Sequence, residues 1–187
     1  MRNKFKARFK VGVALLVIGT SFSFLFRPND DILIKQEIDQ FLYRDTNIYH
    51  SETNDKNEAI AFYQWYRADQ LAVIELNKKR FNWEIVRGVT EGFTGDIQFI
   101  QLDYYAVIFQ RIPARVVNVE ILTQNETVHN GRIVVDEHYQ PFWFYYSDTE
   151  DLSNAIITTY DEDGEIVEVI DVPDQPNENL QRTITIE

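Results

Sequence analysis

The sequence predicts a mainly β fold, an antiparallel meander in the form of a sandwich or an open barrel. An N-terminal membrane helix and one amphipathic helix are expected to precede it. From Glu58 onward, short runs alternate apolar and polar residues, which is typical of half-buried strands. Turn residues separate these runs, and no long helical pattern lies between them. Parallel strands need long, usually helical crossovers, so the connections favour antiparallel pairing.

The first 27 residues predict an export segment. Five bases and no acid precede residue 11, and an apolar run then extends from Val11 to Phe26. A basic flank before an apolar run directs export and stays in the cytoplasm. We therefore expect a single-pass anchor in the cell membrane, with the N-terminus inside and the domain outside. One alternative is secretion after cleavage near Ser21 and Ser23, and another is a buried helix of a soluble protein.

Residues 28–57 are expected to form a membrane-proximal helix and a polar linker. Apolar residues recur with helical spacing over Asp30–Arg44, at Ile34, Ile38, Phe41 and Leu42. Such spacing places them on one face of an amphipathic helix. The polar stretch 45–57 breaks this pattern and predicts a loop.

The β domain is expected over residues 58–171, followed by a flexible C-terminal tail over 172–187, in which residues 183–186 could add an edge strand. Predicted strands cover 59–66, 70–76, 81–86, 97–102, 104–110, 115–122, 132–135, 142–146, 155–160 and 165–170. Gly88, Gly92 and Gly95 predict a loop. Asn130-Gly131 predicts a type I′ hairpin turn, and Asp163-Gly164 predicts the tight turn of the last hairpin.

Charge and cysteine content exclude several function classes. The chain from Asp30 onward carries all 30 acids and 12 of the bases, a net charge of −18. Such a surface repels phosphates, so no nucleic-acid partner is expected. The chain has no cysteine, which excludes disulfides and thiol catalysis. A domain of this length buries a sufficient core without disulfides.

No catalytic residue, metal site or cofactor is predicted. The three histidines, His50, His129 and His138, lack the spacing that presents two ligands to one metal. The acidic group Asp161, Glu162, Asp163 and Glu165 resembles a calcium loop, but Thr159 and Ile170 occupy positions where that loop needs acids. A solvated hairpin turn is the simpler interpretation. No serine lies in a G-x-S-x-G motif.

Aromatic residues are the most unusual feature, with 13 Phe, 10 Tyr and 3 Trp. Two predicted strands concentrate them, one around Tyr63 and Trp65 and the other around Trp143 and Tyr145. Both faces of the second strand are aromatic, because Phe142, Phe144 and Tyr146 alternate with Trp143 and Tyr145. One face must pack in the core. The other is covered by the helix or a second sheet, or forms a binding surface with Trp65, Tyr63, Trp143 and Tyr145 as candidates.

Four stretches carry a family resemblance: Leu71–Val89, Tyr104–Phe109, Pro141–Tyr145 and Tyr160–Gly164. With them the chain resembles a group of small exported proteins from Gram-positive spore-forming bacteria, over about half its length. That group often has glycine where this chain has Gln110. The resemblance implies bacterial export and a β-rich domain, and it implies no functional residues.

The leading functional hypothesis is a non-catalytic extracytoplasmic module that binds an envelope glycan or a protein partner. A first alternative is a carboxylate-dependent hydrolase of envelope carbohydrate, which requires two acids in one cleft. A second is a regulatory or sensor protein whose membrane segment couples to another membrane protein.

Overall fold

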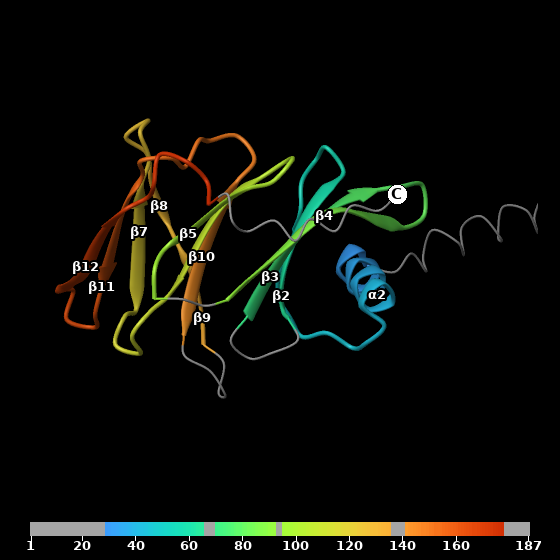
Figure 1. Cartoon of the computed structure of the whole chain (residues 1–187), viewed down its shortest axis with the longest axis horizontal. Coiled ribbons are helices and arrows are strands. Elements are labelled where there is room, and N and C mark those ends of the chain that lie inside the picture. Colours follow the sequence, from blue (N-terminus) through green and yellow to red (C-terminus); the bar gives the residue numbers. More distant parts are fainter. Residues whose placement is uncertain (1–28, 66–69, 93–94, 136–140, 178–187) are drawn as a thin grey trace, which may run out of the picture.

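The structure is a computed structural model that describes residues 29–65, 70–92, 95–135 and 141–177. In these residues, one helix and three antiparallel four-stranded sheets stack as four layers (Figure 1). The mainly β fold is therefore confirmed. No helix within the described ranges is long and apolar enough to cross a membrane, and the N-terminal segment predicted to do so lies outside them.

The three sheets differ in how their strands follow the sequence. Sheet A is a meander of β1 (Ile48–Thr53), β2 (Glu58–Gln64), β3 (Gln70–Lys78) and β4 (Trp83–Gly92). Sheet B has the order β5 (Gln98–Gln101), β6 (Ala106–Arg111), β10 (Phe142–Ser147) and β9 (Arg132–Val134). Sheet C has the order β12 (Ile166–Asp171), β11 (Ile156–Tyr160), β7 (Asn118–Leu122) and β8 (Val128–Asn130). The meander prediction is therefore confirmed for sheet A and is wrong for sheets B and C, which join strands that are distant in the chain.

Helix α2 (Asp30–Leu42) covers the outer face of sheet A. Its predicted apolar face is confirmed, since Ile34 and Ile38 are fully buried against residues of β2, β3 and β4. The helix ends at Tyr43, which has a left-handed backbone with a φ of 53°.

Sheet B is buried on both faces because it lies between the other two sheets (Figure 1). Phe142 and Phe144 of β10 pack against sheet A, where the ring of Phe144 stacks on Phe62 with centroids 4.0 Å apart. Trp143 points the other way and packs against sheet C. This arrangement explains why both faces of β10 are aromatic.

Two predicted loops are strands instead. The polar stretch 45–57 contains β1, which pairs antiparallel with β2 and extends sheet A by one strand. Hydrogen bonding to a neighbouring strand overrides its polar composition, because a backbone ladder does not depend on apolar side chains. Strand β4 likewise continues through Gly88, which pairs with Ile74 of β3.

The predicted Asn130-Gly131 hairpin turn is wrong. Strand β8 pairs with β7 while β9 pairs with β10, so the chain passes from sheet C to sheet B at Gly131. A β carbon on Gly131 would lie 3.0 Å from Trp143 Cε3. Glycine is therefore required here by close packing between sheets and not by turn geometry. The hairpin of β11 and β12 is confirmed, and its Gly164 has a φ of 78°.

Candidate functional site

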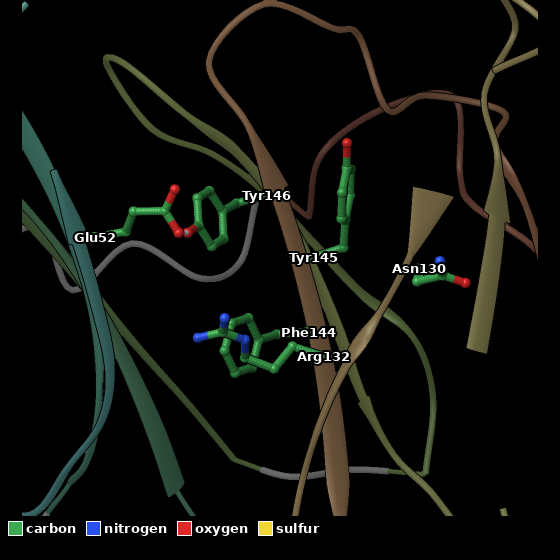
Figure 2. A pocket seen from close by; sticks show the side chains of 6 residues that line it. All are labelled: Glu52, Asn130, Arg132, Phe144, Tyr145 and Tyr146. Carbon is green, nitrogen blue, oxygen red and sulfur yellow. Dashed lines mark hydrogen bonds between the residues drawn. The ribbon is translucent and has the colours of Figure 1, made fainter. Parts of the chain in front are cut away.

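A groove lies where β1 of sheet A approaches β9 and β10 of sheet B. It consists of two adjoining cavities of about 250 Å³ each. The first is lined by Glu52, Asn130, Arg132, Phe144, Tyr145 and Tyr146 (Figure 2). The second shares Glu52, Tyr145 and Tyr146 and adds Thr53, Asn54, Tyr105, Ser147 and Asp148. The groove therefore combines tyrosine rings with acidic, amide and guanidinium groups.

A chain of hydrogen bonds from three strands forms one wall of the groove. Arg132 Nη1 contacts His50 Nδ1, and His50 Nε2 lies 2.8 Å from Tyr146 Oη. The hydroxyl of Tyr146 donates to Glu52 (Figure 2). A guanidinium only donates hydrogen bonds, so His50 accepts at Nδ1 and donates from Nε2. The network thus runs from a cation to a carboxylate through two neutral groups.

The environment of His50 favours this neutral form. Its side chain is 8% exposed. Burial lowers the pKa of His50, and the charge of Arg132 lowers it further, while Glu52 acts in the opposite direction. A protonated His50 would lose its acceptor for Arg132 and place two positive charges side by side. Burial and the bond to Glu52 also raise the pKa of Tyr146, so the network holds its protons at neutral pH.

A second histidine cluster lies on the other side of β10. His129 of β8 contacts Glu150, with Nε2 and Oε2 2.7 Å apart. The imidazole stacks on Tyr145, with ring centroids 4.9 Å apart and an interplanar angle of 29°. Burial raises the pKa of Tyr145 to about 12. The two adjacent tyrosines of β10 are therefore each positioned by a histidine, one from sheet A and one from sheet C.

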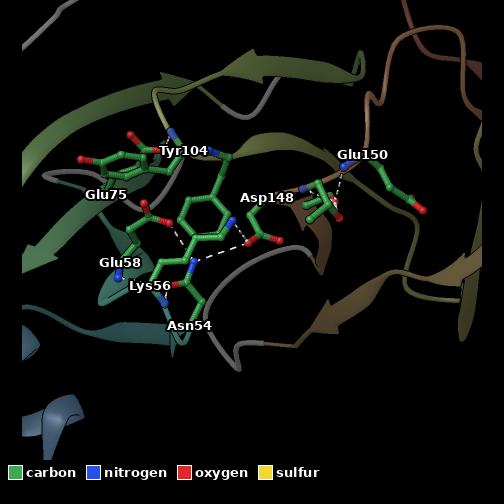
Figure 3. Close-up of polar contacts among 10 residues, drawn as sticks. Asn54, Lys56, Glu58, Glu75, Tyr104, Asp148 and Glu150 are labelled. Atoms are coloured by element: carbon green, nitrogen blue, oxygen red, sulfur yellow. Dashed lines mark hydrogen bonds and ion pairs between the residues drawn. The ribbon is translucent and has the colours of Figure 1, made fainter.

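The far end of the groove carries a polar cluster that joins sheet A to the loop after β10 (Figure 3). Lys56 Nζ lies 3.1 Å from Asp148 Oδ2. Asn54 donates to Glu58 at 2.9 Å and to the same oxygen of Asp148 at 3.5 Å. Since Asp148 lines the groove beside Glu52, two carboxylates face this part of the cavity.

The four aromatic residues proposed from the sequence lie in three different places. Tyr145 lines the groove. Tyr63 and Trp143 are 1% and 0% exposed. A ligand cannot reach these two in this structure, because α2 covers one and sheet C covers the other. Trp65 is half-buried beside the helix layer, with the guanidinium of Arg44 5.4 Å from its ring centroid.

Glu75 is a buried acid that lines neither cavity of the groove. It is 0% exposed on β3, facing sheet B, and its carboxylate accepts backbone N–H bonds from Asp103, Tyr104 and Tyr105 at 2.7 to 3.0 Å (Figure 3). Burial raises the pKa of Glu75 to about 7, although the three N–H donors act in the opposite direction. Its contacts join sheet A to the β5–β6 turn of sheet B, so it has a structural role.

The described residues contain no group of three or more His, Asp or Glu side chains arranged to hold a metal ion. His50 and His129 lie on opposite sides of β10, and His138 lies outside the described ranges. The acidic turn at Asp161–Glu165 is held by bonds from its own backbone to the Asp161 carboxylate, at 2.9 and 3.1 Å. That geometry agrees with the interpretation as a hairpin turn.

Sequence reasoning identified Tyr145 and missed the rest of the groove. His50 and Glu52 lie in a stretch predicted to be a loop, and strand alternation would have placed them on one face had β1 been recognised. Arg132 comes from β9, and no local pattern links it to residue 50, which is 82 positions earlier. No known family matches this chain, and no curated protein or solved structure shows a significant similarity to it.

Proposed function

We propose that this protein is a non-catalytic extracytoplasmic module that binds an envelope glycan in the groove beside β10. The observation that carries the proposal is the pair of adjacent tyrosines, Tyr145 and Tyr146, which line both cavities from opposite faces of β10. Each is oriented by a buried or half-buried histidine. Rings held in place in this way bind a ligand at a low entropic cost, because they lose little freedom on binding.

The groove matches a hydroxyl-rich, uncharged ligand. Arg132 and Glu52 are the two ends of one hydrogen-bonded network, so their charges compensate each other. Asn130 supplies an amide on the first cavity and Ser147 a hydroxyl on the second. Sugars present both hydroxyl groups and apolar C–H faces, and tyrosine offers an apolar ring and a polar tip to such groups.

Titration of purified uncharged glycan strands from a bacterial cell wall tests this proposal. The fragment 29–187, which contains every described layer, should bind the strands. Replacing Tyr145 by Ala should weaken binding by about tenfold, equivalent to about 1.4 kcal/mol. Tyr146→Phe should weaken binding less, because it removes the hydroxyl and keeps the ring.

Tyr160→Ala is the matched control. Tyr160 belongs to β11 of sheet C, where its hydroxyl donates to Glu120 at 3.0 Å, and it lines neither groove cavity. Its removal should leave the affinity unchanged. Equal affinities of wild type, Tyr145→Ala and Tyr160→Ala would contradict the groove as the binding site. Circular dichroism spectra would establish that each variant is folded.

The alternative function is a hydrolase of envelope carbohydrate, and one observation favours it. Glu52 and Asp148 line the same cavity, and paired carboxylates are the usual catalytic groups of glycoside hydrolysis. In that case, the glycan strands would be shortened during the titration. Glu52→Gln and Asp148→Asn would each stop the release of reducing ends without abolishing binding. Intact strands after prolonged incubation would leave the binding module as the proposal.

A further inference from the structure

The β3–β4 turn has a composition that sets it apart from the rest of the domain. It places Lys78, Lys79 and Arg80 in succession, three of the 12 bases that follow Asp30. Phe81 comes next and is 72% exposed. The turn is closed by the Lys79 N–H, which donates to the Asn82 carbonyl at 2.8 Å. Sequence alternation assigns Phe81 to the same face as Trp83 and Ile85, yet only those two are buried.

This turn lies beside the start of α2. Lys78 Nζ forms an ion pair with Asp30 Oδ2 at 2.7 Å, and the indole of Trp83 donates to Asp30 Oδ1 at 3.1 Å. Asp30 is the first residue of the helix. The turn is therefore attached to the point at which the chain arrives from its N-terminal apolar run.

If the apolar run spans the membrane, the short connection to Asp30 keeps the start of α2 close to the membrane surface. The run ends at Phe26, four residues before Asp30, and four extended residues cover at most about 14 Å. The headgroup layer on each side of the hydrocarbon core is about 5 to 8 Å thick. Asp30 would then lie within about 10 Å of the lipid headgroups, which an exposed turn with long side chains can bridge.

The charges in the turn fit an anionic surface better than the rest of the domain does. Lys78 is paired with Asp30, and Lys79 with Glu84 at 3.1 Å. Arg80 forms no ion pair with a carboxylate among the described residues, and its guanidinium lies 5.0 Å from the Phe81 ring centroid. The remaining surface is strongly acidic and repels anionic lipids.

We propose that the β3–β4 turn docks on the anionic phospholipid surface of the membrane, with Phe81 at the boundary between headgroups and acyl chains and Lys79 and Arg80 at the lipid phosphates. An exposed aromatic next to basic residues is the combination that binds membrane interfaces. Docking would hold α2 and sheet A close to the membrane. Sheet C lies at the opposite end of the molecule and would point away from the membrane (Figure 1). This inference rests on the predicted export segment and is independent of the groove.

Site-directed spin labelling of the full chain tests the docking. The chain has no cysteine, so a single introduced cysteine is labelled uniquely. Asn82→Cys, which is exposed in the turn, reports on the membrane, and Asp163→Cys in the exposed β11–β12 turn is the matched control. The protein is reconstituted in vesicles of phosphatidylcholine, with or without about 30% phosphatidylglycerol, which makes the vesicle surface anionic.

The expected result is that the label at position 82 loses collisions with a water-soluble nickel chelate and gains collisions with oxygen when phosphatidylglycerol is present. The label at position 163 should remain fully accessible to the chelate. Two variants remove the docking contacts: one carries Phe81→Ser, and the other carries both Lys79→Glu and Arg80→Glu. In each, the collision rates of the label at position 82 should become equal to those at position 163. Equal accessibility at both positions in both vesicles would overturn the proposal, as would failure of the full chain to remain with the vesicles.

Discussion

Glutamate side chains are usually exposed to solvent, but Glu75 is fully buried. It occurs in a strand whose other residues from Leu71 to Leu76 are apolar and buried. Its carboxylate satisfies three backbone N–H groups of the β5–β6 turn. A buried polar group without a partner costs about 1 to 3 kcal/mol, so the acid and the turn depend on each other.

The Glu75→Gln variant should reveal the protonation state of this acid. Burial raises the pKa of Glu75 from 4.5 to about 7, so the folded state holds the proton more tightly than the unfolded state. The contribution of Glu75 to the free energy of unfolding is therefore complete below pH 4.5. It decreases by up to about 3 kcal/mol as the pH rises to about 7. The stability deficit of the glutamine variant should therefore shrink over this range, measured by urea unfolding.

Glu75→Ala provides the comparison, because it leaves the three N–H groups without an acceptor at every pH. It should be destabilised by more than the glutamine variant at pH 4.5. A deficit of Glu75→Gln that grows with pH would mean that the three N–H bonds outweigh burial and keep the folded pKa below 4.5.

Gly131 lies between β8 and β9, where the chain passes from sheet C to sheet B. Its backbone N–H donates to the Val119 carbonyl of β7 at 2.9 Å, just before the chain enters β9. The β carbon of any other residue would lie 3.0 to 3.1 Å from the side chains of Trp143 and Val119. Both neighbours are 0% exposed and belong to the core between sheets B and C, so a shift of either must displace other buried side chains.

Gly131→Ala should therefore destabilise the protein by about 1 to 3 kcal/mol through overpacking between sheets B and C. Gly95→Ala is the control, since its β carbon would meet nothing within 4 Å and should change stability by less than about 0.5 kcal/mol. Thermal unfolding of the two variants gives the comparison. A Gly131→Ala variant as stable as Gly95→Ala would contradict the close packing at this crossing.

The stacking of layers makes the whole molecule one unit. Sheet B contributes to the core with sheet A and to the core with sheet C, and β10 supplies residues to both. Loss of sheet B would expose both cores. The helix layer depends on sheet A in the same way, because Ile34 and Ile38 are buried against it.

We expect the fragment 29–187 to unfold in a single cooperative transition. Trp83 belongs to the core between α2 and sheet A, and Trp143 to the core between sheets B and C. Trp83→Phe and Trp143→Phe, each combined with Trp65→Phe, give proteins in which a single tryptophan reports on one of these cores. In each, fluorescence and far-ultraviolet circular dichroism should give the same urea midpoint. A fluorescence midpoint that differs from the dichroism midpoint in either protein would mean that the layers unfold separately.

The sequence by itself determined the features that depend on neighbours in the chain. Periodicity predicted the buried face of α2, and Asp163-Gly164 predicted the β11–β12 hairpin; both are confirmed. Alternation in residues 142–146 predicted that both faces of β10 are aromatic. These signals are local, because side-chain direction repeats every 3.6 residues in a helix and every two in a strand.

The tertiary structure alone decided which surfaces meet. It covered Tyr63 and Trp143 and left Tyr145 at a groove. It also brought His50 to Tyr146, 96 positions later, and placed β10 between β6 and β9. Strand order and interlayer contacts follow from the total apolar area buried by all layers together, and no short stretch of sequence carries that information.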